Sequence, residues 1–218
     1  MDFNDSQQEA EFRKEARKFL EANAEKRSII ADKPSDKGSQ IAVAGAPETV
    51  KGGLEAAKAA LENAKVWQKK KADAGFAAIL WPKEFGGYGG SPIQQVVYSQ
   101  EEHDFLVPSG YFEIGIGMLG QTMMLWGKDE DKKRYLPKMI TGEEIWCQLF
   151  SEPSAGSDLA GIKMKAEKDG DEWVLNGQKV WTSGAHFADF GMIVARSDPS
   201  ALKHKGLTYF YLDMKTPG

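Results

Sequence analysis

Hydrophobic side chains in the first half of the chain recur every three or four residues, the spacing of one helix face. Ser6 and Glu9 form a capping-box pattern before the first such run, which predicts a helix start. Residues 28–53 are rich in Lys, Asp, Ser, Gly and Pro, and we expect a mobile surface loop there. A second helix follows and is expected to end at Gly75. The apolar positions of the two helices are Phe12, Ala16, Phe19 and Leu20, then Leu54, Ala57, Leu61 and Ala64.

Capping and charge patterns predict two further helices. Ser91 precedes Pro92 and Gln94, which suit the first and third positions of a helix. Three acids beginning at Asp129 are followed by three bases beginning at Lys132, an order that matches the helix dipole. The helix after Ser91 is expected to bury Ile93, Val96 and Val97.

From about Glu144 onward the pattern changes to short runs separated by turn residues, which is typical of strands. Charged residues alternate with less polar ones over 162–168, and Gly170 and Gly177 lie in turns on either side of the strand predicted at 172–175. We therefore predict an α+β chain, with an all-α helical domain at residues 1–142 and an antiparallel β-domain at 143–218. The remaining strand candidates are 146–150, 165–166, 192–194 and 207–212.

Composition narrows the class of protein. The 218 residues carry 28 Lys plus Arg against 32 Asp plus Glu, and a net charge of -4 argues against a nucleic-acid partner. The single Cys147 excludes an intrachain disulfide and fits a reducing compartment. No apolar run approaches the roughly 18 residues of a membrane span, and the N-terminus lacks the pattern of a secretory signal. We expect a cytoplasmic protein with no membrane association.

Two polar segments contain the residues best suited to binding chemistry. The first polar segment, 151–158, is Ser-Glu-Pro-Ser-Ala-Gly-Ser-Asp, and the second polar segment, 176–183, is Asn-Gly-Gln-Lys-Val-Trp-Thr-Ser. Trp181 offers an aromatic face, a feature that suits a planar ring with polar edges. We expect the two segments to face one another at the rims of the sheet. The hydroxyls available as donors and acceptors belong to Ser151, Ser157 and Ser183.

These segments resemble the acyl-CoA dehydrogenases, flavin enzymes that oxidise acyl thioesters to 2-enoyl thioesters. Residues 81–90, Trp-Pro-Lys-Glu-Phe-Gly-Gly-Tyr-Gly-Gly, and Leu119-Gly-Gln121 followed by Gly127 support the resemblance, in the family's order. The resemblance implies an N-terminal helical domain and part of a middle β-domain, with FAD as the cofactor. It places the family's catalytic glutamate on a closing helical domain beyond Gly218, so no catalytic residue is assigned in this chain.

The resemblance also implies individual roles. Trp181 matches the aromatic that covers one flavin face, and Ser183 matches the hydroxyl that meets flavin N5, the acceptor of hydride from the acyl β-carbon. Phe150 and Ser151 match contacts to the pyrimidine edge of the flavin ring. Gly156 and Ser157 match positions near the flavin diphosphate and the pantetheine arm of the substrate. The acyl pocket is expected to be lined by Leu119, Gln121 and Met124, although ordinary helix packing explains these three equally well.

Other candidate sites are set aside. The pattern Gly115-Ile-Gly-Met-Leu-Gly120 matches a dinucleotide fingerprint, but without a surrounding βαβ unit we interpret it as small residues of a packed helix. The three histidines lack metal-ligand spacing, so no metal site is expected. Cys147 is expected to pack in the interior, since no basic neighbour favours a thiolate. Glu152 is expected to organise its loop and not to act as a base.

The predicted function is therefore an FAD-dependent acyl-CoA dehydrogenase. Its expected partners are an acyl-CoA substrate, an electron-transfer flavoprotein or similar acceptor, and further subunits in a homo- or hetero-oligomer. A second hypothesis is a non-catalytic flavin- or partner-binding subunit, whose open sheet edge at 207–212 pairs with another chain. A third is that the chain is simply a fragment.

Overall fold

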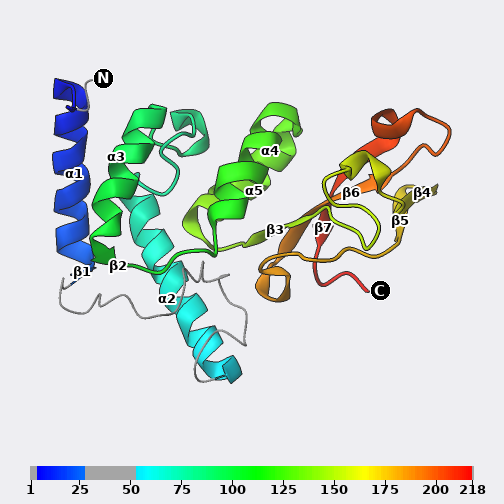
Figure 1. Ribbon diagram of the computed structural model, residues 1–218, viewed down its shortest axis with the longest axis horizontal. Coiled ribbons are helices and arrows are strands. Elements are labelled where there is room, and N and C mark those ends of the chain that lie inside the picture. The colour runs from blue at the N-terminus through cyan, green and yellow to red at the C-terminus, as the bar shows by residue number, and fades with distance from the viewer. Residues whose placement is uncertain (1–3, 28–52, 218) are drawn as a thin grey trace. The chain divides into compact units, whose positions relative to one another are not determined.

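The computed structural model describes residues 4–27 and 53–217, which fall into two compact units, Met1–Glu143 and Glu144–Gly218 (Figure 1). The first unit is helical and the second is built on a sheet, so the predicted α+β fold class is confirmed. Most of the loop predicted at 28–53 lies outside the described residues, and Gly53 begins a helix. Among the described residues, no helix combines the length and the apolar character needed to cross a bilayer.

The helical unit contains helices whose ends follow their caps. Both predicted capping boxes are present: the Ser6 hydroxyl and the Glu9 carboxylate bond to each other's backbone amides, and Ser91 and Gln94 do the same. Two short strands, β1 (Glu25–Lys26) and β2 (Phe105–Leu106), pair antiparallel. The helices are α1 (Gln7–Asn23), α2 (Gly53–Asp73), α3 (Pro92–His103), α4 (Gly120–Trp126) and α5 (Asp129–Thr141), with a 3-10 turn η1 (Lys83–Phe85) and a π-helical stretch η2 (Gly115–Leu119).

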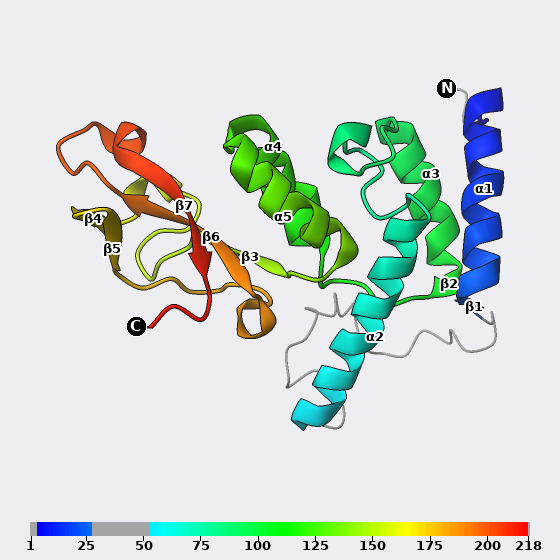
Figure 2. The ribbon, with the colours of Figure 1, turned by 180° about the vertical axis from the view of Figure 1, so that it is seen from behind.

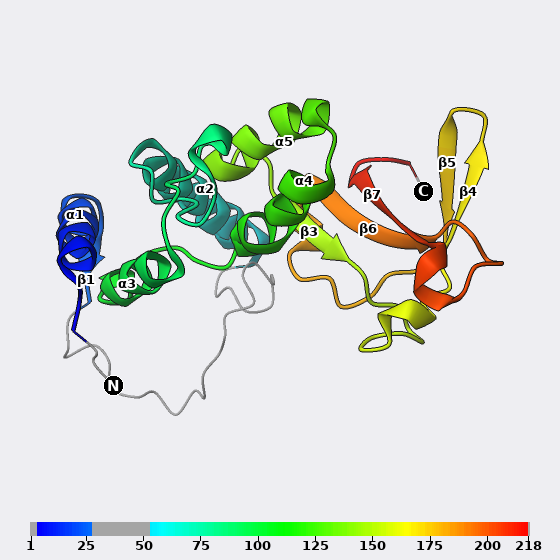
Figure 3. The same cartoon turned by 90° about the horizontal axis from the view of Figure 1, so that it is seen from above.

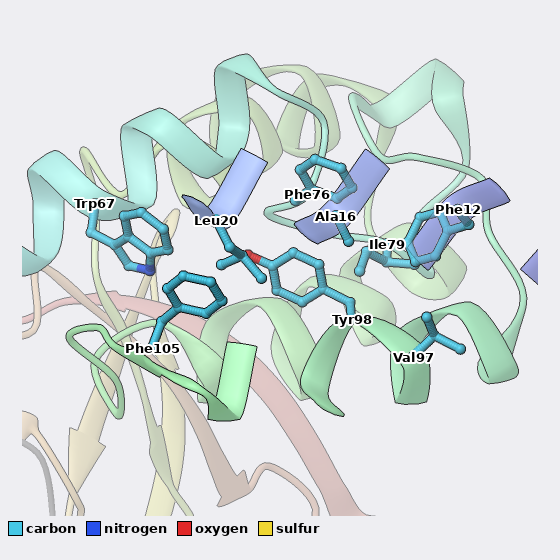
Figure 4. Packing of buried hydrophobic residues seen from close by; sticks show 9 residues of the cluster. All are labelled: Phe12, Ala16, Leu20, Trp67, Phe76, Ile79, Val97, Tyr98 and Phe105. Atoms are coloured by element: carbon cyan, nitrogen blue, oxygen red, sulfur yellow. The ribbon is translucent and has the colours of Figure 1, made fainter. Parts of the chain in front are cut away.

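The core of the helical unit forms where α1 and α3 lie side by side, as both Figure 1 and Figure 2 show. Aromatic and aliphatic side chains from several elements meet there (Figure 4). Burial of this apolar surface is the main stabilising contribution to the unit. The cluster consists of Phe12, Ala16, Leu20, Trp67, Phe76, Ile79, Val97, Tyr98 and Phe105.

The buried face of α3 differs from the predicted one. Val97 is buried as expected, but Ile93 and Val96 are 52% and 50% exposed, so the prediction for these two is wrong. The buried positions go instead to Gln94, which caps the helix, and to Glu101. Glu101 is retained inside because arginines of α1 bond to its carboxylate at 2.7 to 2.9 Å. Specific polar pairing across the helices therefore sets the orientation of α3.

The small residues of the Gly115–Gly120 pattern are predicted to pack in a helix, and this holds for the buried Gly115 and Gly120 but not for the exposed Gly117. The Trp81 indole, 1% exposed, donates a hydrogen bond to the Ile116 carbonyl at 2.9 Å. A Cβ built at Gly120 would lie 2.1 Å from Trp81, so a side chain would collide with the ring. This segment is η2 running into α4.

The second unit is a five-stranded mixed sheet around β6 (Phe190–Arg196). The antiparallel prediction holds for β6 with β7 (Leu207–Asp213) and for the hairpin of β4 (Lys165–Asp169) with β5 (Glu172–Asn176), visible in Figure 3. It is wrong for β3 (Trp146–Leu149), which pairs with β6 in parallel from Trp146↔Phe190 to Leu149↔Ile193, and for the contact of β4 with β6, which is parallel at Lys165↔Arg196. Forty residues that include the hairpin separate β3 from β6, long enough for the crossover that parallel pairing requires.

Cys147 lies on β3 and is 1% exposed. Burial raises the pKa of its thiol to about 11, so the thiol stays protonated at neutral pH. The expectation that Cys147 is a packing residue is confirmed.

Candidate functional site

The first polar segment leaves the end of β3 and folds into a tight turn. The Glu152 amide donates to the Ala155 carbonyl at 2.8 Å, and the Ala155 amide returns a bond of 3.1 Å to the Glu152 carbonyl. Ala155 is buried against Ile162 and Val194. With Ala155 anchored, Gly156 and Ser157 directly after it are exposed. The anchored turn therefore leaves a glycine and a serine hydroxyl exposed to solvent.

A buried ion pair joins the two polar segments. The Glu152 and Lys179 side chains are each 5% exposed, and Glu152 Oε1 lies 2.9 Å from Lys179 Nζ. The Glu152 carboxylate also accepts the amides of Lys163 at 2.6 Å and Met164 at 3.0 Å, while Lys179 donates to the Phe150 carbonyl at 3.1 Å. These bonds confirm that Glu152 organises its loop.

The environment of Glu152 keeps its carboxylate ionised. Burial acts to raise its pKa, but bonds from the Lys163 amide, the Lys179 ammonium and the Met164 amide outweigh burial and hold the pKa below its ordinary value. The bonds from the Lys163 and Met164 amides to Glu152 also explain where β4 begins. The alternation of charged and less polar residues starts at 162, but the strand starts at Lys165. Lys163 and Met164 donate to a side chain in place of a neighbouring strand.

Trp181 has an unusual conformation and environment. Its backbone lies in the left-handed region, with φ 60°, which is rare for a bulky residue. Its side chain is 92% exposed. The neighbouring Val180 amide donates to the Ser151 carbonyl at 2.9 Å, so the backbone of Trp181 is held next to Ser151. The indole therefore presents both faces from a backbone that is fixed on one side.

The remaining residues of the second polar segment lead into a short turn. Ser183 is exposed and precedes Gly184, whose φ of 75° begins the 3-10 turn η4 (Ala185–Phe187). Phe150, from the end of β3, is half-buried and packs edge-on against the Tyr209 ring at 5.6 Å. The bonds from Lys179 to the Phe150 carbonyl and from Val180 to the Ser151 carbonyl link the two polar segments, as expected for segments that face one another.

The three predicted acyl-pocket residues lie in the helical unit. Leu119 is 1% exposed and packs inside that unit. Gln121 lines a cavity of about 360 Å³ together with residues such as Tyr98 and Ile116. Met124 is half-buried on α4. Gln121 therefore lies beside a cavity of the helical unit.

Sequence patterns did not predict two cationic side chains, Lys179 and Arg196, that organise the sheet unit. Lys179 is one, and no local pattern predicts its burial, since the polar Gln178 precedes it and lysine is itself rarely buried. Arg196 at the end of β6 is the other. Its guanidinium donates to three backbone carbonyls, those of Ala160 at 2.7 Å, Lys203 at 3.0 Å and Ile162 at 3.2 Å. It thereby fixes the chain that follows the first polar segment.

In the described ranges 4–27 and 53–217, no three His, Cys, Asp or Glu side chains gather in the way a metal ion would need. The second unit instead carries an exposed aromatic ring, Trp181, on a segment that a buried ion pair joins to the first polar segment. An exposed indole on an anchored backbone, with the exposed Ser157 and Ser183 in the same two segments, suits a planar polar ligand.

Comparison with known proteins identifies the family. The family model of the acyl-CoA dehydrogenase N-terminal domain matches residues 46–143, and that of the acyl-CoA dehydrogenase middle domain matches residues 147–218. The chain belongs to the acyl-CoA dehydrogenase family, which confirms the resemblance found in the polar segments.

Three relatives indicate how much of such a protein is represented. Acyl-CoA dehydrogenase IpdE1 of Mycobacterium tuberculosis is 39% identical over 154 residues, which are 71% of this chain and 40% of that protein. The solved Tcur3481-Tcur3483 steroid ACAD matches with a TM-score of 0.72 and 31% identity, over 98% of this chain and 49% of that one. The ChsE4-ChsE5 complex from Mycobacterium tuberculosis matches with a TM-score of 0.68 and 29% identity, over 99% and 49%. The chain therefore spans half or less of the length of these relatives.

Proposed function

We propose that this chain forms the flavin-binding part of an FAD-dependent acyl-CoA dehydrogenase. The reaction is the α,β-dehydrogenation of an acyl-CoA thioester, and FAD, when bound, supplies the acceptor for hydride at N5. The observation that carries the proposal is the exposed Trp181, held beside Ser151 in a left-handed backbone. Membership of the family supports it.

The conformation of Trp181 argues for a binding role. A bulky residue in the left-handed region costs on the order of 1–3 kcal/mol, and such strain concentrates at functional sites. Exposure of the indole to water does not offset this strain, because an exposed ring buries little apolar area. A planar ring laid on the indole would cover that area and gain a stacking interaction. The residue therefore fits the aromatic cover of a flavin.

The serine hydroxyls of the two polar segments fit the polar edges of the same ligand. Ser183, two residues further along, would donate toward N5, and Ser151 with the Phe150 backbone would contact the pyrimidine edge. Each neutral bond contributes roughly 0.5–1.5 kcal/mol, enough to orient the ring and tune its reactivity.

The turn at the end of the first polar segment fits the phosphate and pantetheine side of the site. A Cβ built at Gly156 would meet no protein atom within 4 Å, so the chain leaves open space there. Ser157 would donate to the diphosphate or to the pantetheine arm. In the helical unit, Gln121 would line the acyl pocket. Leu119 and Met124 would support the pocket wall as packed side chains behind it.

Glu152 is unsuited to be the base that removes the proton beside the thioester. Its side chain is 5% exposed, and its oxygens already accept bonds from two amides and an ammonium. A depressed pKa makes it a weaker base still. We therefore assign no catalytic base among the described residues.

The proposal is tested by purifying the full chain and titrating it with FAD. We expect binding with quenching of flavin fluorescence, and bleaching of the flavin absorbance by an acyl-CoA only when a catalytic base is supplied from outside the described residues. Trp181→Ala should weaken FAD binding, whereas Trp126→Ala, which removes a similarly exposed indole from α4 (84% exposed), should not. Equal FAD affinity in the two variants would overturn the assignment of Trp181.

A second candidate is a non-catalytic flavin-binding subunit of a hetero-oligomer. The support for it is that one matching structure is a complex of two differently named proteins, ChsE4 and ChsE5. This candidate predicts FAD binding without bleaching by acyl-CoA thioesters, and light scattering that shows assembly only with another chain. For the dehydrogenase, we propose that electrons leave to an electron-transfer flavoprotein or a similar acceptor.

A further inference from the structure

The two stretches proposed to contact the flavin are tied together beneath the surface by the Glu152–Lys179 ion pair. On one side, Lys179 bonds to the Phe150 carbonyl, and Glu152 itself follows Ser151. On the other side, Lys179 is two residues before Trp181. Each charged side chain is thus next to a proposed flavin contact without being exposed to the ligand.

Stability alone does not explain why these charges are buried. A buried ion pair loses hydration on both sides, and this loss offsets most of the attraction between the charges. Replacing such a pair by apolar residues is often neutral or stabilising. What a buried pair does provide is a fixed geometry, because its bonds are short and directional and a shifted arrangement would leave a charge without a partner.

The geometry fixed here is the spacing of the proposed site. The Glu152 carboxylate is itself held in place by the amides at the start of β4, at 2.6 and 3.0 Å, so it is a rigid acceptor for Lys179. Beside it, the Val180 amide bonds to the Ser151 carbonyl at 2.9 Å. Without the ion pair, the chain before Trp181 would lose one of the interactions that hold it next to Ser151.

We infer that Glu152 and Lys179 are positioning residues, which set the separation between Ser151 and the Trp181 indole and thereby the affinity for FAD. The inference rests on the proposed flavin site. Neither residue touches the flavin, and neither takes a proton. Their effect is transmitted through the backbones of Phe150 and Val180.

The test uses charge-removing variants of the full chain with similar side-chain size. Glu152→Gln, Lys179→Met and the double variant Glu152→Gln/Lys179→Met would be titrated with FAD, and each melt would be followed by circular dichroism. The matched control is Lys203→Met, which removes an exposed partner of Asp158 at 4.0 Å. The flavin absorbance spectrum serves as a further readout, because it responds to the surroundings of the ring.

We expect both single variants to lower FAD affinity about tenfold, the lower end of the loss found when residues that orient metal ligands are changed. The double variant should melt close to the unsubstituted chain, since no charge is left buried alone, while its FAD affinity stays low and its flavin spectrum is altered. Lys203→Met should change neither property.

Three outcomes would overturn the inference. A folded double variant that binds FAD as tightly as the Lys203→Met control would show that the pair does not position the site. A double variant that does not fold would show that the pair is needed for the fold itself. If the unsubstituted chain does not bind FAD, the proposed function fails and the inference fails with it.

Discussion

Substituting Gly120 by alanine should destabilise the helical unit, because the new methyl group would collide with Trp81. A Cβ built at Gly120 lies 2.1 Å from Trp81 Cζ2 and 2.5 Å from Cη2, and 3.0 Å from Met139 Sδ. Trp81 cannot move away freely. It is 1% exposed, and its indole nitrogen is bonded to the Ile116 carbonyl at 2.9 Å. Either the ring or the start of α4 must shift.

Two opposing contributions decide the size of the effect. Alanine favours a helix over glycine by about 1 kcal/mol. Overpacking a buried site costs typically about 1–3 kcal/mol, and losing the Trp81 hydrogen bond would add about 1 kcal/mol. The net expectation is a loss of about 1–3 kcal/mol. Gly117→Ala is the matched control, since a Cβ at Gly117 meets no atom within 4 Å and only the propensity gain remains.

The assay is thermal unfolding followed by far-ultraviolet circular dichroism. For a chain of this size, 1 kcal/mol corresponds to a shift in Tm of about 2–4 °C. Gly120→Ala should therefore lower Tm by several degrees, while Gly117→Ala should leave it unchanged or raise it slightly. Equal Tm values for the two variants would refute the steric reasoning. Adding Trp81→Phe to Gly120→Ala should recover part of the loss, because the smaller ring gives the methyl group room.

Three further predictions concern the sheet unit. Trp181→Ala should weaken FAD binding more than Ser151→Ala, because stacking area contributes more than one neutral hydrogen bond, and equal losses in an FAD titration would contradict this. Glu152 has a pKa below its ordinary value of 4.5, so its contribution to stability is present above about pH 4.5 and is lost as the pH falls through the folded-state pKa. The difference in Tm between the unsubstituted chain and Glu152→Gln should therefore shrink below about pH 4.5, and a difference that stays constant down to about pH 3 would count against it. Arg196→Met should destabilise this unit by about 2 kcal/mol in urea unfolding, since three carbonyls lose their donor, and an unchanged midpoint would show that water replaces the guanidinium without cost.

Features fixed by neighbours in the chain could be predicted from the sequence. The capping boxes at Ser6 and Ser91 each join residues three positions apart, so the pattern contains both partners. The β4–β5 hairpin is likewise local, with a turn at Gly170 between strands of alternating polarity. In these cases the residues that form the bonds are the residues that the pattern displays.

Features that depend on distant partners could not be predicted in this way. Apolar periodicity placed Ile93 and Val96 inside, but the buried carboxylate of Glu101 finds its arginines on α1, more than eighty residues away. The parallel pairing of β3 with β6 depends similarly on the path of the intervening chain. The residues next to Glu101 and to β3 in the sequence do not indicate which distant residues they pair with.

The candidate site combines both kinds of feature. The polar segments could be recognised because hydroxyls, a glycine and a tryptophan lie close together in the sequence. The left-handed conformation of Trp181 could not, since a tryptophan after an apolar valine favours an extended strand. Local preference and adopted structure therefore conflict at this residue, as they do at functional sites. Because Trp181 does not hold this conformation by its own preference, the surrounding bonds must hold it. We therefore expect that changing the Glu152–Lys179 pair alters the affinity of the proposed flavin site without altering any atom that the flavin would touch.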